Sequence, residues 1–163
     1  MTEIPKDRPV FLLVLCILSF TWMGLSVLTG AGQLVLGPSS DQEMAVSLKA
    51  MDKTIDELES KQMESWKPTF EKFKIMTIRS NENFYGIGIS GLLITILGIF
   101  SVIMMLKGNK NGFHIYIGYS LLSAASYYFF ISPSVIPTFL IIISLLLSGI
   151  FVAMYAVNLK WMR

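Results

Sequence analysis

Three long tracts of this chain carry no Asp, Glu, Lys or Arg: Val10 to Gly37, Phe84 to Leu106, and Asn111 to Leu159. A helix on the surface of a water-soluble protein needs a polar side that faces solvent. An α-helix rises about 1.5 Å per residue and needs about 20 apolar residues to cross the roughly 30 Å hydrocarbon core of a bilayer. The lengths of these tracts therefore predict membrane-spanning helices.

The last tract is too long for one span and is interrupted by residues 132–137, which include Pro133 and Pro137. Proline lacks an amide donor and disfavours helix at the residue before it. The sequence therefore predicts an all-α membrane protein with four transmembrane helices in a bundle. These spans are expected at about 10–32, 84–106, 112–131 and 137–158. A single domain of 163 residues is expected, with 38–83 as an insertion between the first two spans.

The first tract has an alternative interpretation as a signal peptide, because Thr29 and Ala31 offer a small-residue cleavage site. However, this tract exceeds the roughly 7 to 15 apolar residues of a usual signal peptide. Acidic residues Glu3 and Asp7 also accompany the cations before it. We therefore expect a retained membrane helix.

Lysine and arginine collect near the cytoplasmic ends of membrane helices. One predicted side holds both termini, the loop between the second and third spans, and six cations: Lys6, Arg8, Lys107, Lys110, Lys160 and Arg163. The 38–83 segment has seven cations at lower density, and the 132–137 connection has none. We therefore expect a bacterial inner-membrane protein with cytoplasmic termini and with residues 38–83 in the periplasm.

Residues 38–83 predict an amphipathic helical segment. Ser40 and Glu43 have the spacing of a capping box that begins a helix, and Pro68 marks a bend or a second helix start. Residues 73–79 fit either a helix or a strand, and we expect a helix. An apolar partner-binding stripe is predicted at Met44, Leu48, Met51, Ile55, Leu58, Trp66, Phe70 and Phe73. This stripe either covers the chain's own membrane helices or the lipid interface, or binds another protein.

Small and polar residues repeat at helical spacing within the predicted spans, including Ser19 in the first and Tyr155 in the fourth. In lipid, helices associate through close backbone approach and interhelical hydrogen bonds. The predicted helix-packing positions are Gly88, Gly91, Thr95, Gly98, Ser144 and Ser148. The alternative is a polar pocket for a lipid or a small ligand. That pocket would be lined by Tyr116, Ser120, Ser123, Tyr127, Ser144 and Ser148.

The sequence offers no residue pattern for catalysis or metal binding. His114 and Cys16 are the only histidine and the only cysteine, and no acidic residue occurs in either of their apolar tracts. No phosphate-binding glycine motif occurs, and no charged side chain at membrane depth could serve a pump or a proton-coupled carrier. The net charge of +2 includes no basic patch for nucleic acid. We expect no enzyme, no cofactor and no metal.

Three stretches resemble recurring parts of uncharacterised small four-span inner-membrane proteins of Bacteroidota: RPVFLLVLCILSF (8–20), KNGFHIYIGYSLL (110–122) and YAVNLKWM (155–162). This resemblance implies an inner-membrane location and carries over no catalytic motif. Several packing faces without a reactive group predict a non-catalytic accessory or scaffold subunit of a larger inner-membrane complex. Protein export, secretion and transport machinery are the candidate assemblies. The expected partners are the lipid bilayer and other membrane protein subunits.

Overall fold

The computed structural model describes residues 9–60 and 63–162. Within these ranges the structure is helical and contains no strand, which confirms the predicted all-α class. The elements in chain order are α1 (Val10–Leu36), α2 (Asp41–Ser60), the 3-10 helix η1 (Glu64–Trp66), α3 (Lys67–Glu82), α4 (Phe84–Leu106), α5 (Lys110–Ala125), the 3-10 helix η2 (Ser126–Phe129) and α6 (Thr138–Ala156). Three of these helices, α1, α4 and α6, are long and apolar enough to cross a membrane. These three helices suggest a membrane protein.

Two of the four predicted spans differ from the helices in the structure. The first continues through Gly30 and Gly32 and ends only at Gly37, whose φ of 86° suits a residue without a side chain. In apolar surroundings a broken backbone hydrogen bond is expensive, so an internal glycine does not end a helix there. The predicted span at 112–131 corresponds to α5, whose α-helix of 16 residues ends at Ala125, followed by the four residues of η2. It is not among the three long apolar helices.

α4 and α5 form an antiparallel pair joined by a short turn. The turn contains Gly108 at φ 78°, and Asn109 caps α5 by accepting a 2.9 Å hydrogen bond from the Asn111 backbone N–H. Close packing starts directly after the turn. A Cβ atom added at Gly112 would lie only 2.7 Å from the Met105 backbone nitrogen. Glycine at this position therefore allows the two backbones to come together.

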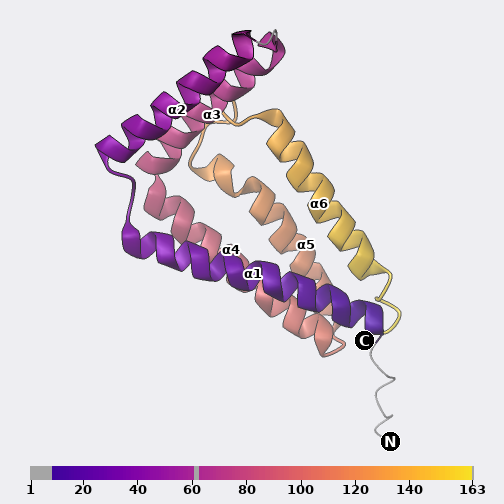
Figure 1. Ribbon diagram of the computed structural model, residues 1–163. Coiled ribbons are helices and arrows are strands. Elements are labelled where there is room, and N and C mark those ends of the chain that lie inside the picture. Colours follow the sequence, from indigo (N-terminus) through magenta and orange to yellow (C-terminus); the bar gives the residue numbers. More distant parts are fainter. Residues whose placement is uncertain (1–8, 61–62, 163) are drawn as a thin grey trace, which may run out of the picture.

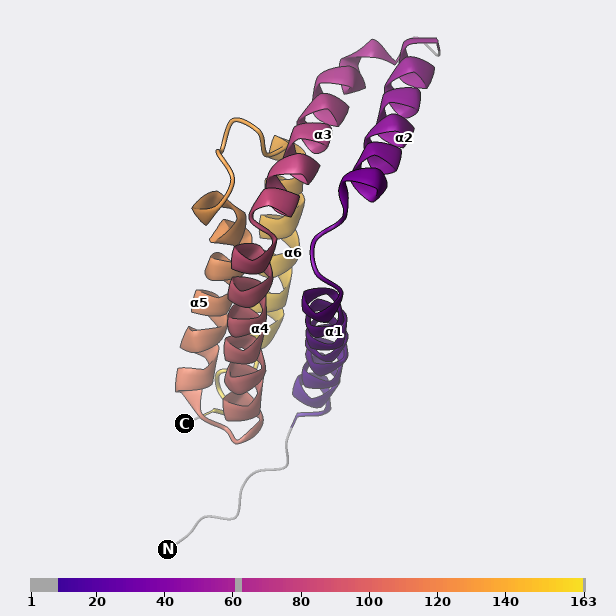
Figure 2. The same ribbon diagram turned by 90° about the vertical axis from the view of Figure 1, so that its left-hand side faces the viewer.

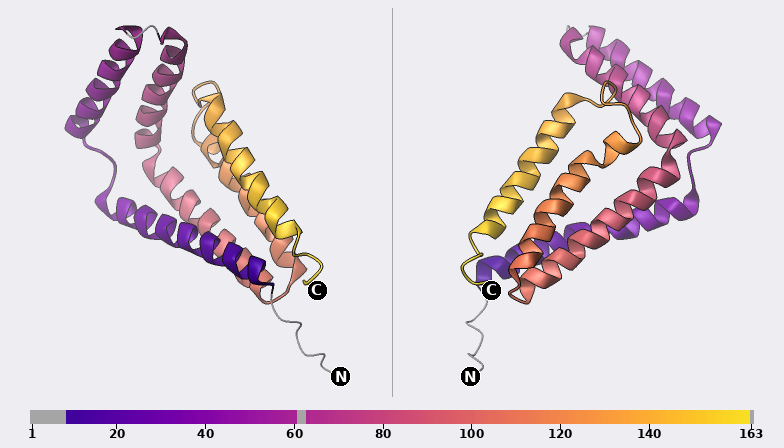
Figure 3. Two further views of the ribbon diagram at one scale, coloured as in Figure 1. Left: turned by 45° about the vertical axis from the view of Figure 1, so that its right-hand side comes forward. Right: turned by 180° about the vertical axis from the view of Figure 1, so that it is seen from behind.

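α1 lies along α4, and α6 lies along α5 (Figure 1). The start of α1 meets the end of α6 near the C-terminal end of the chain, and the two helices diverge toward α2 and α3 (Figure 3). Buried apolar side chains form the core at this meeting point: Leu12, Leu15, Cys16, Met23, Val102, Met105, Phe113, Tyr116, Tyr155 and Met162. The opposite end of the helices is more open, and α2 and α3 lie there.

α2 and α3 form an antiparallel hairpin that extends beyond the ends of the apolar helices (Figure 2). α2 begins with the predicted capping box, in which the Ser40 backbone N–H donates to Glu43 Oε2 over 2.8 Å and the Glu43 N–H donates to Ser40 Oγ over 3.3 Å. The hydrogen bonds from the Ser40 backbone and hydroxyl lower the pKa of the Glu43 carboxyl. Pro68 lies in the first turn of α3, which confirms a helix start there. Residues 73–79 lie within α3, so the helical alternative for them is correct.

α3 continues into α4 through one non-helical residue, Asn83. The Asn83 side-chain amide donates to the Arg79 carbonyl over 3.0 Å, and the Asn83 carbonyl accepts from the Ile87 N–H over 3.0 Å. The chain changes direction here without losing its hydrogen bonds (Figure 1). The position of the hairpin is therefore coupled to the direction of α4.

Candidate functional site

Polar contacts at its base and near its middle join the two helices of the α2–α3 hairpin. At its base, the Ser39 N–H donates to Asn81 Oδ1 over 2.8 Å, and Asn81 Nδ2 donates back to the Ser39 carbonyl over 3.0 Å. Nearer its middle, Lys74 Nζ pairs with Asp52 Oδ1 over 2.5 Å. This ion pair is partly exposed, so its contribution to stability is at most about 1 kcal/mol. The reciprocal hydrogen bonds at the base join Asn81 of α3 to the backbone just before α2.

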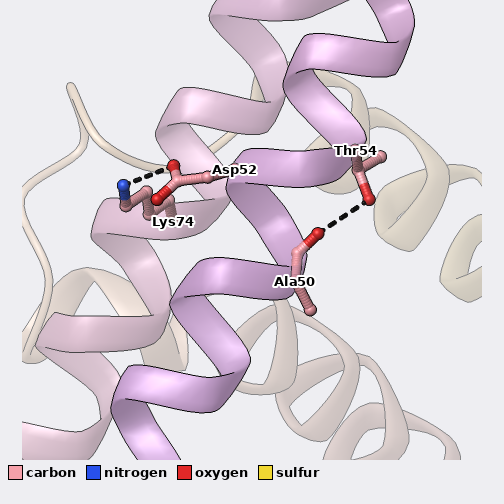
Figure 4. Close-up of polar contacts among 4 residues, drawn as sticks. All are labelled: Ala50, Asp52, Thr54 and Lys74. Atoms are coloured by element: carbon pink, nitrogen blue, oxygen red, sulfur yellow. Dashed lines mark hydrogen bonds and ion pairs between the residues drawn. The ribbon is translucent and has the colours of Figure 1, made fainter.

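A shallow groove follows the hairpin on the side away from this ion pair. Figure 4 shows Asp52 and Lys74 on one side of α2, and Ala50 and Thr54 on the other. The groove has a volume of about 420 Å³ and is lined by Ser47, Ala50, Met51, Thr54, Phe70 and Phe73. Three of these residues, Met51, Phe70 and Phe73, belong to the predicted partner-binding stripe. The structure therefore brings part of that stripe into one concave surface.

The remaining residues of the predicted stripe have varied environments. Ile55 is buried, and Met44, Leu48 and Leu58 are half-buried on α2. Trp66 is exposed but makes an edge contact with Phe139 at the start of α6, with ring centroids 6.4 Å apart.

Phe73 makes a second contact of this kind with Phe139, at 5.7 Å. Part of the stripe therefore packs against the chain's own membrane helix. For Trp66 and Phe73 this contact agrees with the self-covering alternative.

A cavity of about 240 Å³ lies between α3 of the hairpin and the helices α5, η2 and α6. It is lined by Met76 of α3, the end of α5 with η2, and the start of α6. The lining residues are Met76, Ser123, Ala124, Tyr127, Tyr128, Ile136, Leu140, Ile141 and Ser144. None of these side chains is charged. The cavity therefore suits a neutral, largely apolar molecule or segment.

The predicted pocket overlaps this cavity at Ser123, Tyr127 and Ser144. The other three predicted residues are not in its lining. Tyr116 and Ser120 are buried closer to the core, where the ring of Tyr116 lies 4.8 Å from that of Tyr155 between centroids. The sequence missed Met76, because only the folding of the hairpin over α5 and α6 places an α3 side chain at this site. Helical spacing from Ser123 predicted Tyr127, but helical spacing carries no information about the residues of the opposing wall.

Only some of the predicted packing positions of α4 lie close to another helix. A Cβ added at Gly88 would lie 2.7 Å from Leu34 of α1, and one at Gly98 would lie 2.8 Å from Tyr119 of α5. At Gly91, by contrast, an added Cβ would meet no atom within 4 Å, so this glycine makes no close helix approach in the described structure. Thr95 is half-buried and donates to the carbonyl of Gly91 over 2.8 Å within its own helix.

On α6, the predicted positions Ser144 and Ser148 are half-buried, and only Ser144 lines the cavity. A buried polar contact instead ties α6 to α1. Ser19 Oγ and Tyr155 Oη lie 2.9 Å apart and are hydrogen-bonded, and Cys16 Sγ lies 3.9 Å from the same Tyr155 oxygen. This contact satisfies hydroxyl groups that would otherwise be costly in a dry interior. Its role is therefore the joining of two helices.

Within residues 9–60 and 63–162, no group of three His, Cys, Asp or Glu side chains has the proximity to hold a metal ion. His114 lies on the exposed side of α5 beside the ring of Phe113.

Comparisons with protein-family models, curated proteins and solved structures found no match. The hairpin groove and the cavity are the candidate binding surfaces of the described residues.

Proposed function

We propose that this chain is a four-span inner-membrane protein in which α5 and η2 together form the third span. At about 1.5 Å per α-helical residue and about 2.0 Å per 3-10 residue, the 16 residues of α5 and four of η2 extend about 32 Å. This length matches the roughly 30 Å hydrocarbon core of a bilayer. The antiparallel packing of α5 on α4 supports the same arrangement.

In this topology both termini and the α4–α5 turn face the cytoplasm, and the α2–α3 hairpin lies in the periplasm. The positive-inside rule supports this orientation. The turn carries Lys107 and Lys110, and Lys160 follows α6 at the same end of the molecule, whereas the 132–137 connection near the hairpin carries no charge. Attaching a reporter that is active only in the cytoplasm after Asn109 and after Pro133 tests the orientation. The topology predicts activity only for the fusion after Asn109.

Within this topology, the chain acts as a non-catalytic accessory or scaffold subunit of an inner-membrane complex, such as protein-export, secretion or transport machinery. The observation that carries this proposal is the preformed hairpin groove with Met51, Phe70 and Phe73 in its lining. A concave apolar surface in contact with water favours association with a partner. The apolar side chains of α6 offer a second contact region, since only 6% of its most apolar stretch is buried inside the protein.

Affinity purification of the tagged full-length chain in a mild detergent, followed by quantitative mass spectrometry, tests the accessory role. A Phe70→Ser variant should lose a membrane-protein partner that the wild-type chain retains. The matched control is Ile75→Ser, because Ile75 is an exposed apolar residue of the same helix that lies outside the groove lining. Recovery of the wild-type chain alone would overturn the proposal, as would equal partner loss in both variants.

A second candidate function, binding of a lipid or small ligand, is favoured by one specific observation. Three residues predicted to line a pocket, Ser123, Tyr127 and Ser144, do line the cavity beneath the hairpin. Native mass spectrometry of the purified chain tests for a retained molecule of defined mass. A cavity that holds only water would remove this candidate.

A further inference from the structure

The serine and threonine hydroxyls of α1 and α4 have hydrogen-bond partners, whereas those of Ser123 and Ser144 in the cavity have none among the described residues, and Ser120 and Ser148 are like them in this respect. Hydroxyls at Thr21, Thr29 and Thr95 donate to carbonyl groups one turn earlier in their own helices, over 2.8 to 2.9 Å. Such a bond satisfies a hydroxyl inside a membrane without a partner from another helix. The same pattern occurs at Ser26, Ser90 and Ser101.

Four hydroxyl-bearing side chains line the cavity, namely Ser123, Tyr127, Tyr128 and Ser144. None of their hydroxyls has a hydrogen-bond partner among the residues that the structure describes. None of these hydroxyl oxygens is fully buried, and Tyr127 and Tyr128 are exposed, so a molecule that enters the cavity can reach them. These four groups are therefore available as donors to an occupant of the cavity.

The depth of the cavity narrows the choice of occupant. Ile136 precedes α6, and Ser144 lies six residues beyond Thr138, the first residue of the helix, or about 9 Å along its axis. In the proposed topology, with α6 entering the bilayer at Thr138, the cavity begins at the membrane interface and reaches into the hydrocarbon of the leaflet on the hairpin side. In a bilayer, ester carbonyls and the first part of the acyl chains occupy this depth.

The size of the cavity and its uncharged lining also fit an ester carbonyl and the first part of an acyl chain. A volume of about 240 Å³ is below the roughly 300 to 1,000 Å³ of pockets that enclose a whole small ligand, so it suits part of a longer molecule. The absence of charged side chains from the lining leaves nothing to recognise a phosphate or amine. A neutral acceptor attached to an apolar chain fits both the hydroxyls and the apolar wall that includes Met76, Leu140 and Ile141.

We propose that this cavity binds the ester group and upper acyl chain of one membrane lipid from the leaflet on the hairpin side. Hydroxyls of the cavity donate to an ester carbonyl, and the chain packs along the apolar wall. The lipid headgroup stays outside the cavity and is not selected. This inference rests on the second candidate function, since it names the ligand class for the same site.

The test uses the full-length chain reconstituted separately in nanodiscs of diester or diether phosphatidylcholine of equal chain length. After release in native mass spectrometry, the diester lipid should be retained about fivefold more than the diether lipid, as expected for one neutral hydrogen bond. Replacing the phosphocholine headgroup by phosphoglycerol should leave retention unchanged. Equal retention of diester and diether lipids would overturn the role of the hydroxyls.

Ser144→Leu fills the cavity and should abolish the retention of the diester lipid. The control is Gly149→Leu on the same helix, because a Cβ at Gly149 meets no atom within 4 Å. Lipid retained equally by wild type and Ser144→Leu would place the lipid elsewhere and overturn the inference, while lipid binding itself would stand. If no lipid is retained, a thermal-shift screen of small neutral molecules separates the two ideas. A positive compound would preserve the binding function and overturn the lipid inference, and no positive compound would overturn both.

Discussion

Replacing Gly112 by alanine tests the closest backbone approach between α4 and α5. The added Cβ would lie 2.7 Å from both the Met105 nitrogen and the Ser101 carbonyl oxygen, whereas non-bonded contacts are optimal at about 3.5 to 4.0 Å. Both neighbours are backbone atoms, so neither can rotate away. The two helices must separate by nearly 1 Å, and overpacking of this kind costs about 1 to 3 kcal/mol.

The matched control is Gly118→Ala on the same helix, where an added Cβ meets no atom within 4 Å. There, alanine gains up to about 1 kcal/mol from its higher helix propensity. Unfolding in mixed micelles of rising SDS content, followed by tryptophan fluorescence, gives the free energy of unfolding of each variant. We expect a lower value for Gly112→Ala and an equal or higher value for Gly118→Ala. If Gly112→Ala were as stable as its control, the close packing of α4 on α5 would be refuted.

Three further predictions concern single contacts. In a double-mutant cycle, Ser19→Ala and Tyr155→Phe should show a coupling of about 0.6 to 1.7 kcal/mol in the same SDS assay, and additive effects would contradict their hydrogen bond. Phe139→Ala should increase hydrogen exchange in α3 without changing α4, because it removes the ring contacts between the hairpin and α6. The Glu43 carboxyl should titrate below the ordinary pKa of a glutamate by NMR, and Ser40→Ala should move it part of the way back. Because this pKa is lower in the folded chain, the capping contribution is present above the ordinary value and is lost as the pH falls through the folded value.

Most of the helical structure was predictable because each signal is local. The apolar tracts mark α1, α4 and α6, and the interruption at 132–137 separates α5 from α6. The capping box at Ser40 and the proline at position 68 mark the starts of α2 and α3 through backbone hydrogen bonding within one turn. The helix α1 extends to Leu36, beyond the predicted span end at about 32, because Gly30 and Gly32 are ordinary helical residues in an apolar environment.

The candidate site was only partly predictable. Helical periodicity assigned Ser123, Tyr127 and Ser144 to common faces, and all three reach the cavity. The same periodicity assigned Tyr116 and Ser120 to that face, but their positions along α5 bury them in the core instead. Periodicity shows which residues share one side of a helix. It does not show how far along that side a neighbouring helix covers them.

By itself, the sequence determined that the chain is helical and apolar over most of its length, because backbone hydrogen bonds cannot remain open in a hydrocarbon environment. Only the tertiary structure decided which glycines allow close approach, Gly88 and Gly98 but not Gly91. It also decided that Phe139 meets the hairpin and that a cavity lies beneath Met76. These features depend on contacts between segments far apart in the chain. In lipid such contacts follow from the complementary shapes of particular helix surfaces, which apolar composition does not specify.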